Sequence, residues 1–221
     1  MRTGRERFRA GVRAGTPFAG AAFVLSVSFG VVAADAGFPA VAAVVMSAVV
    51  FAGSAQFAAV GILAAGGSLA AAVGAAALVN SRFVPMGFAL APSLHGRRAR
   101  RAVEGQAVVD TSWAMAARGD GSFDREFLFG HTGVQYVAWV AGTAVGVLVP
   151  ALDSRALGLD AILPAFFLTL LYAEVRDRRR LAVAVAGAAI ALLLVPVTPP
   201  GVPVLLAGSA ALVGLYQRSS T

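Results

Sequence analysis

The chain of 221 residues contains no cysteine and no lysine, and only 13% of its residues are charged. The absence of cysteine excludes disulfide bonds and thiolate metal sites. A soluble domain of this length would carry about twice this fraction of charged residues. Hydrophobic residues make up 58% of the chain, and apolar segments of about 20 residues, long enough to cross a bilayer, recur along it. The composition therefore predicts an integral membrane protein embedded in the lipid bilayer.

Sequence signatures of common enzymes are also lacking. The chain has no P-loop, no His-Glu-x-x-His motif and no pair of carboxylates at catalytic spacing. Gly53-Ser54 does not fit the nucleophile elbow Gly-x-Ser-x-Gly, and the two histidines, His95 and His131, have no partner motif. We therefore predict no catalytic residue, no metal site, no cofactor and no enzymatic activity. An intramembrane hydrolase that uses Ser54 and His131 is the enzyme alternative.

The net charge of +7 comes from arginines that gather mainly in three clusters, at Arg2–Arg13, Arg97–Arg101 and Arg176–Arg180. Short basic loops between apolar spans are typical of the cytoplasmic side of a membrane protein. A nucleic-acid-binding protein instead needs its basic groups on one continuous face. The clusters predict a multi-pass protein of the bacterial cytoplasmic (inner) membrane, with a cytoplasmic basic N-terminus at residues 1–15, and no nucleic-acid partner.

Apolar segments divide the chain into about seven predicted helical spans, so the fold class is all-α. The spans are Thr16–Ala36, Pro39–Ala65, Ser68–Leu94, Phe127–Pro150, Leu159–Val175, Leu181–Val197 and Val202–Tyr216. A polar central segment, residues 95–126, separates the third span from the fourth. Small residues at Gly20–Ala22 and Gly142–Gly146 predict close approach of helices. We expect one integral membrane domain over residues 1–221.

The topology of the first half requires an interrupted span. Three spans separate the first two arginine clusters, and an odd number of crossings cannot return the chain to the same side. Polar residues interrupt the second span at Phe51–Phe57 and the third at Val79–Pro85. Non-helical backbone at membrane depth is tolerated where it lines a cavity or is buried in protein, and paired interruptions are typical of a transporter's binding site. We expect these two spans to be broken or re-entrant.

The candidate substrate-binding residues lie in these two interruptions: Gly53, Ser54, Gln56, Asn80 and Arg82. Arginine at the centre of a membrane helix costs about 2.5–3.5 kcal/mol, so Arg82 should face a cavity or a carboxylate. If the helix breaks at Pro85, Arg82 can instead reach the headgroups. A helix that begins near Gly53 or Asn80 presents free N–H groups that suit a carboxylate. Nearby phenylalanines favour an amino acid with an aliphatic side chain. The amides of Gln56 and Asn80 could equally bridge helices.

Asp110 is the candidate for proton coupling. It lies in the moderately apolar segment Ala102–Ala117, between the second arginine cluster and the charged stretch Arg118–Glu126. One interpretation is a solvated helix face or an ion-pair partner for one of the neighbouring arginines. The other is a protonatable group that couples transport to a proton gradient. The sequence pattern leaves both open.

The stretch Met46–Phe57, with the sequence MSAVVFAGSAQF, resembles the signature of the AzlC family, large subunits of branched-chain amino acid exporters. Asn80-x-Arg82 is similar to the second polar break of that family, and Asp110-Thr111 to an Asp after its basic loop. Ser81 and Trp113 depart from the family's pattern. The similarity extends from about Thr16 to Arg180.

This resemblance implies a two-component permease that works with a small, separately encoded AzlD-type membrane subunit and exports branched-chain amino acids. It also implies that Gly53, Ser54, Gln56, Asn80, Arg82 and Asp110 are functional positions. From the residues themselves we expect secondary transport by alternating access around the two broken segments. A transporter or channel for another small solute is the alternative.

Overall fold

The computed structural model describes residues 3–149, 168–169, 171–172, 175 and 177–210. Within these residues all regular elements are helices, and the only β pairing is an isolated bridge between Ala117 and Phe123. The all-α prediction is therefore confirmed for the described part of the chain. Most of the predicted fifth span and the end of the seventh lie outside the described residues.

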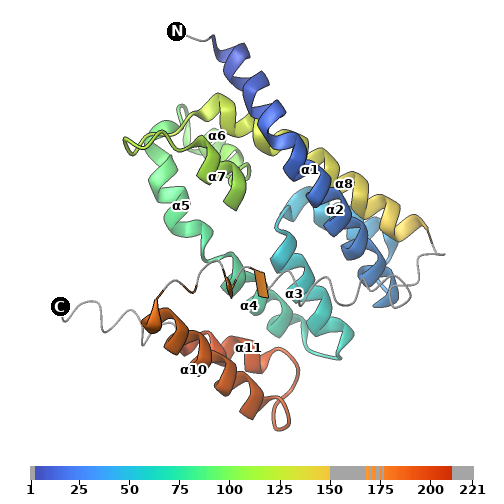
Figure 1. Ribbon diagram of the computed structural model, residues 1–221. Coiled ribbons are helices and arrows are strands. Elements are labelled where there is room, and N and C mark those ends of the chain that lie inside the picture. Colours follow the sequence, from blue (N-terminus) through green and yellow to red (C-terminus); the bar gives the residue numbers. More distant parts are fainter. Residues whose placement is uncertain (1–2, 150–167, 170, 173–174, 176, 211–221) are drawn as a thin grey trace. The chain divides into compact units, whose positions relative to one another are not determined.

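The helices follow one another as shown in Figure 1. They are α1 (Gly4–Asp35), α2 (Ala40–Val50), α3 (Gly53–Ala64), α4 (Leu69–Asn80), α5 (Phe83–Leu90), the 3-10 helix η1 (Ala91–Ser93), α6 (Arg98–Gly105), α7 (Asp110–Ala116), α8 (Arg125–Leu148), α10 (Arg178–Leu194) and α11 (Val202–Ala207). Both interrupted apolar segments are broken helices, because α2 is separated from α3 and α4 from α5. The breaks lie within the polar stretches that the sequence pattern indicates.

The described residues form two compact units. The first contains the described parts of Met1–Gly53 and Asn80–Asp153, and the second those of Ser54–Val79 and Ser154–Thr221. The chain therefore passes from one unit to the other at the two helix breaks. That the chain acts as one membrane domain stays a prediction.

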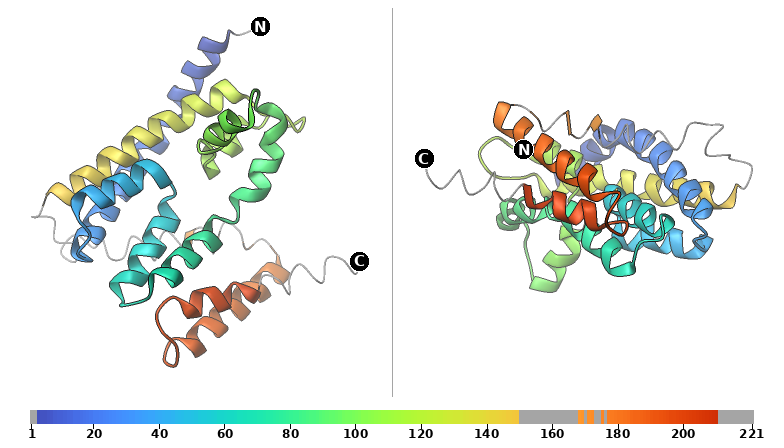
Figure 2. Two further views of the ribbon diagram at one scale, coloured as in Figure 1. Left: turned by 180° about the vertical axis from the view of Figure 1, so that it is seen from behind. Right: turned by 90° about the horizontal axis from the view of Figure 1, so that it is seen from below.

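In the first unit, α1 and α8 lie side by side along most of their length (Figures 1 and 2). Glycines allow this approach: a Cβ at Gly15 would lie 2.6 Å from the carbonyl oxygen of His131, and one at Gly30 would lie 2.5 Å from that of Thr143. Gly142 and Gly146 also face α1 backbone, which confirms close approach there. Gly20 does not take part, since a Cβ on it would meet open space among the described residues. Close approach at Gly20 is therefore not seen among the described residues, and the prediction for Ala21 and Ala22 stays a prediction.

The remaining helices of the first unit pack on α8. The Ser47 hydroxyl of α2 lies 2.8 Å from the Thr143 hydroxyl. At the other end of α8, buried apolar side chains from α5 to the start of α8 form a core cluster: Leu90, Leu94, Val108, Ala116, Phe123 and Leu128. This cluster holds the polar central segment against α8 and so positions Asp110.

The second unit contains α3, α4, α10 and α11. The loop between α10 and α11 turns at Gly201, whose φ of 93° is left-handed. A Cβ at Gly201 would also lie 2.8 Å from that of Ala71, so the loop packs closely on α4. Gly74 of α4 faces Leu205 of α11 in the same way.

The helix lengths bear on membrane crossing. By length and composition, α1 alone among the described helices could cross a bilayer, and α4 with α5 and η1 would make a second crossing if this bent pair is one span. Shorter apolar helices are α2, α3 and Arg180–Leu194 of α10. The seven spans stay a prediction.

Candidate functional site

The first helix break centres on Phe51. Its φ of 44° and ψ of 47° place it in the left-handed region, and no other non-glycine residue in the described part of the chain has a positive φ. For a bulky residue this conformation costs on the order of 1–3 kcal/mol, and such strain persists only where the surroundings hold it. Phe51 ends α2 and turns the chain toward Gly53, where α3 begins.

Tyr136 of α8 holds this break. Its ring lies edge-on to the ring of Phe51, with centroids 5.1 Å apart. Its hydroxyl donates a 2.9 Å hydrogen bond to the carbonyl of Ala48. That carbonyl belongs to the last turn of α2, where helix geometry leaves carbonyls without an intrahelical donor. One side chain therefore supports both the strained residue and the helix end before it.

The three candidates of the first break have separate surroundings. Gly53 lies against Trp139, since a Cβ on it would be 2.5 Å from Cη2 of that ring. Ser54 and Gln56 are buried in the first turn of α3, with 3% and 0% of their surface exposed. Gly53 belongs to the first unit, whereas Ser54 and Gln56 belong to the second.

The second helix break contains Asn80 and Arg82. Asn80 ends α4, and its buried Oδ1 has no hydrogen-bond partner among the described residues. Arg82 directly precedes α5, with its guanidinium 4.9 Å from the ring centroid of Phe83. A buried amide oxygen without a donor is typical of a site that accepts a polar ligand or water.

Asp110 is the carboxylate that pairs with Arg82. Nη2 of Arg82 donates a 2.9 Å hydrogen bond to Oδ2 of Asp110, the first residue of α7. The side chains are 32% and 44% exposed, so the pair is accessible. Of the six predicted site residues, the structure brings these two into contact. One of the interpretations left open for Asp110 was an ion pair with a neighbouring arginine; the arginine that it contacts is that of the second break.

A hydrogen-bonded chain starts beside this pair. Thr111 donates through its hydroxyl to Oε1 of Gln135 at 3.1 Å, and Nε2 of Gln135 lies 2.9 Å from Nδ1 of His131. His131 is fully buried, and the ring of Phe18 lies 5.1 Å from its own. Sequence reasoning missed the partnership of His131 and Gln135, although the i, i+4 spacing on one helix would have indicated it.

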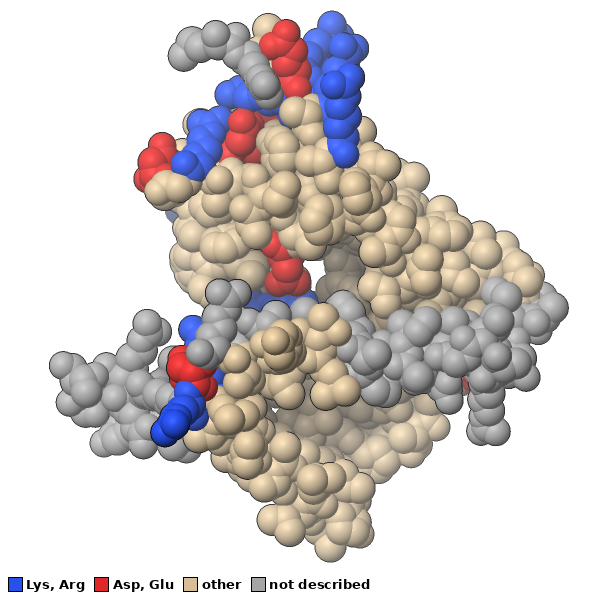
Figure 3. Space-filling model, viewed as in Figure 1, with Lys and Arg blue, Asp and Glu red and all other residues tan. Residues whose placement is uncertain are grey.

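Charged side chains gather at the end of the first unit where α1 begins, at the top of Figure 3. Glu104 accepts hydrogen bonds from Arg100 at 2.8 Å and from Arg125. The bond from Arg125, helped by Arg100, holds the pKa of the Glu104 carboxyl below its ordinary value of 4.5. These contacts join α6 to the start of α8, so we assign them to stability.

Asp124, directly before α8, contacts Arg7 of α1 at the same end of the first unit. Burial by itself would raise the pKa of its carboxyl, but the Phe127 N–H and the guanidinium groups of Arg118 and Arg7 lower it below the ordinary 3.8. The Arg118 bond measures 3.0 Å, and Arg7 of α1 lies 3.8 Å away. Nowhere in the described residues do three His, Asp or Glu side chains gather as they would around a metal ion.

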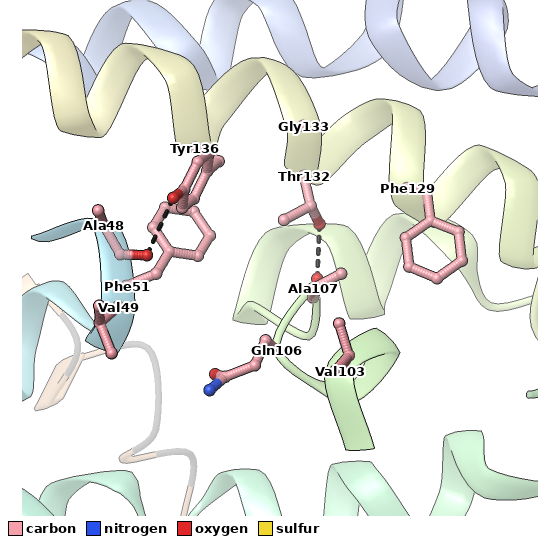
Figure 4. A pocket seen from close by; sticks show the side chains of 10 residues that line it. All are labelled: Ala48, Val49, Phe51, Val103, Gln106, Ala107, Phe129, Thr132, Gly133 and Tyr136. Atoms are coloured by element: carbon pink, nitrogen blue, oxygen red, sulfur yellow. Dashed lines mark hydrogen bonds between the residues drawn. The ribbon is translucent and has the colours of Figure 1, made fainter. Parts of the chain in front are cut away.

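A cavity of about 370 Å³ opens beside the first break (Figure 4). Its lining residues come from α2, α6, α8 and the loops that follow α2 and α6: Ala48, Val49, Phe51, Val103, Gln106, Ala107, Phe129, Thr132, Gly133 and Tyr136. None of them is charged, and most are apolar or aromatic. None of the six predicted site residues lines it.

The chain matches a known protein family. The family described as AzlC protein matches residues 17–152, more than half of the chain. The chain belongs to the AzlC family. The family that the sequence pattern indicated is thereby confirmed, and the matched range includes both helix breaks and Asp110.

The chain is also similar to a named bacterial protein. The Branched-chain amino acid transport protein AzlC of Bacillus subtilis (strain 168) is 26% identical over 157 residues. The alignment covers 69% of this chain and 61% of the relative, so this chain spans less than two thirds of that protein's length. No solved structure matches the chain.

Proposed function

We propose that this AzlC-family chain is the large subunit of a two-component permease that exports branched-chain amino acids across the bacterial cytoplasmic membrane. Its partner would be a small AzlD-type membrane subunit. Family membership and the name of the Bacillus subtilis relative support the substrate class. The observation that carries the mechanism is the accessible Arg82–Asp110 pair at a helix break.

The mechanism that we propose uses competition for Arg82. A carboxylate of the substrate and the carboxylate of Asp110 both suit the planar guanidinium, which binds such groups in a bidentate manner. When Asp110 takes up a proton on its carboxylate oxygen, it loses its charge and binds Arg82 less strongly. The substrate carboxylate then replaces it, and release of that proton on the other side reverses the exchange. Asn80, with its unpaired buried Oδ1, suits the substrate's ammonium group as an acceptor.

Alternating access around the two breaks completes the proposal. Both breaks lie where the chain passes between the two compact units. Hinges are a few loop or element-terminal residues that absorb large changes in backbone angles, and residues 51–53 and 80–82 have that position. Gly53, Ser54 and Gln56, at the start of α3, stay candidate substrate-binding positions in this proposal.

Efflux from cells preloaded with labelled leucine tests the function. We expect faster efflux from cells that express this chain with an AzlD-type subunit, and no change for labelled lysine. Arg82→Ala should abolish the gain at equal membrane expression. Arg118→Ala is the matched control, because it removes an arginine from the Asp124 pair outside the site. Equal efflux with and without the folded complex would refute the exporter and favour a transporter or channel for another small solute.

A further inference from the structure

We infer that the cavity beside Phe51 is the subsite that receives the aliphatic side chain of the transported amino acid. This inference rests on the proposed function and adds the part of the site that selects the substrate. The two breaks would then have different tasks. Arg82 at the second break would bind the α-carboxylate that all amino acids share. The cavity at the first break would bind the side chain, which differs between them.

The lining of the cavity selects for apolar groups. Val49, Val103 and the ring of Phe129 offer apolar surface, and no charged side chain lines the space. Its volume of about 370 Å³ lies near the lower end of the range of about 300–1,000 Å³ for small-ligand pockets. An ammonium or carboxylate on the substrate's side chain would find no charged partner in the lining, which is unfavourable once water is displaced. A leucine or isoleucine side chain fits this surface.

Two of the three polar side chains at the cavity, those of Tyr136 and Thr132, are already engaged, and the third is the amide of Gln106. The Tyr136 hydroxyl donates to the carbonyl of Ala48, and the Thr132 hydroxyl donates to that of Ala107 at 2.6 Å (Figure 4). In both bonds the hydroxyl hydrogen is donated to a backbone carbonyl of the protein itself. These two hydroxyls therefore offer no donor to a polar side chain of the substrate.

The walls are also held in place before any ligand enters. The left-handed backbone of Phe51 and its contact with Tyr136 fix the ring between α2 and α8. Strained backbone at a ligand-binding position is a known form of pre-organisation. The strain at Phe51 has a function under this inference, because a relaxed residue at this position would move the ring out of the wall.

Gly133 provides the means to fill the cavity without disturbing the fold. It lies on α8 within the lining, and a Cβ built on it has no neighbour within 4 Å in the described structure. A larger side chain there enters the cavity and leaves the α1–α8 interface intact. Gly20 on α1 is the matched control, since it too is a helical glycine whose Cβ would meet open space in the described residues, and it does not line the cavity.

The test is export of leucine, valine and alanine by the complex carrying Gly133→Ala, Gly133→Val or Gly133→Leu, with Gly20→Leu as control. We expect the KM for leucine to rise along the series, by about 10-fold or more for Gly133→Leu, with a smaller change for alanine. The maximal rate for alanine should stay near that of Gly20→Leu. Val103→Phe, which fills the cavity from the opposite wall, should give the same order of substrates.

Three outcomes would overturn the subsite. One is an equal loss for leucine and alanine, and another is kinetics identical to those of Gly20→Leu. The third is loss of the AzlD-type subunit from the purified complex with KM unchanged, which would make the cavity a subunit contact. The unaltered complex separates this inference from the proposed function: if it exports none of the three amino acids, the function itself is refuted, whereas normal export with unaffected variants refutes the subsite alone.

Discussion

Arg82 donates a 2.9 Å hydrogen bond to Asp110, and this contact joins the second helix break to the polar central segment. Removing either partner leaves the other without its counter-charge in a partly buried place. The two residues are 28 positions apart in the chain, so the pair forms only when α5 and α7 pack together around the apolar cluster of the first unit. The contact explains how an arginine is accommodated within an apolar segment.

Asp110→Asn should uncouple export from the proton gradient. The amide can still accept a hydrogen bond from Arg82, but it carries no charge and takes up no proton. In the proposed exchange the proton and the substrate cross in the same direction. We therefore expect leucine efflux by the unaltered complex to accelerate under an outward proton gradient, and efflux by the variant to be the same with and without that gradient. Proteoliposomes with an imposed gradient provide the measurement.

The control for this experiment is Asp120→Asn. Asp120 lies in the same central segment, is exposed, and bonds only to Ser122 in the described structure. Its variant should keep the full response to the gradient. A response that survives in Asp110→Asn would remove Asp110 from proton coupling and leave it as the structural partner of Arg82.

Glu104→Gln should lower the free energy of unfolding by about 1–3 kcal/mol at neutral pH, because it weakens charge-assisted hydrogen bonds from Arg125 and Arg100. The pKa of Glu104 is lowered in the folded protein. Its stabilising contribution is therefore present above about 4.5, the ordinary value, and is lost as the pH falls through the folded pKa. Thermal unfolding in detergent across this range should show a smaller acid-induced loss in the variant.

Glu126→Gln is the comparison for that experiment. Glu126 also contacts Arg125, at 3.0 Å, but its side chain is 32% exposed against 9% for Glu104. Its loss should therefore cost less. Equal costs for the two variants would show that burial does not set the strength of this network.

Gly146→Ala and Gly20→Ala should change stability in opposite directions. A Cβ at Gly146 would lie 2.9 Å from Cα of Gly30 and would meet the carbonyl of Val27, and backbone cannot move aside without separating α1 from α8. We expect a loss of about 1–3 kcal/mol. Gly20→Ala should gain up to about 1 kcal/mol from helix propensity, since its Cβ meets open space among the described residues. Melting temperatures of the purified variants test this; equal shifts would contradict the α1–α8 interface.

Phe51→Gly should be more stable than Phe51→Ala by about 1 kcal/mol, although both lack the ring. Glycine adopts a positive φ without steric cost, whereas alanine keeps the strain of the left-handed backbone. Comparison of the two variants by thermal denaturation isolates the backbone contribution. If alanine were equally stable, the positive φ at position 51 would not be retained in the protein.

Local chemistry made the helix breaks predictable. Gly53, Asn80 and Arg82 disturb an apolar pattern at their own positions, and the ends of α2 and α4 fall beside them. The need of Arg82 for a counter-charge was also predictable, because the cost of burying a charge does not depend on the fold. Which carboxylate meets that need was not, since several acidic residues were available at similar sequence distances.

Other features could not be read from sequence spacing. The left-handed Phe51 is held by Tyr136, far along the chain on α8, and nothing near Phe51 in the sequence signals a positive φ. The cavity beside it is lined by residues of three helices and two loops, and it has no sequence motif. Gly142 and Gly146 pack α1 on α8, whereas Gly20 faces open space among the described residues. Composition alone does not define which side of a helix meets its neighbour.

The sequence by itself determined the helical class, the family and the places where helices break, because hydrophobicity, chain-breaking residues and the cost of an apolar arginine act locally. Only the tertiary structure decided that Asp110 neutralises Arg82, that Tyr136 holds Phe51 in a strained conformation, and that an apolar cavity opens there. These relationships join residues that are distant in the chain, and they arise from packing α1, α2 and the central segment onto α8.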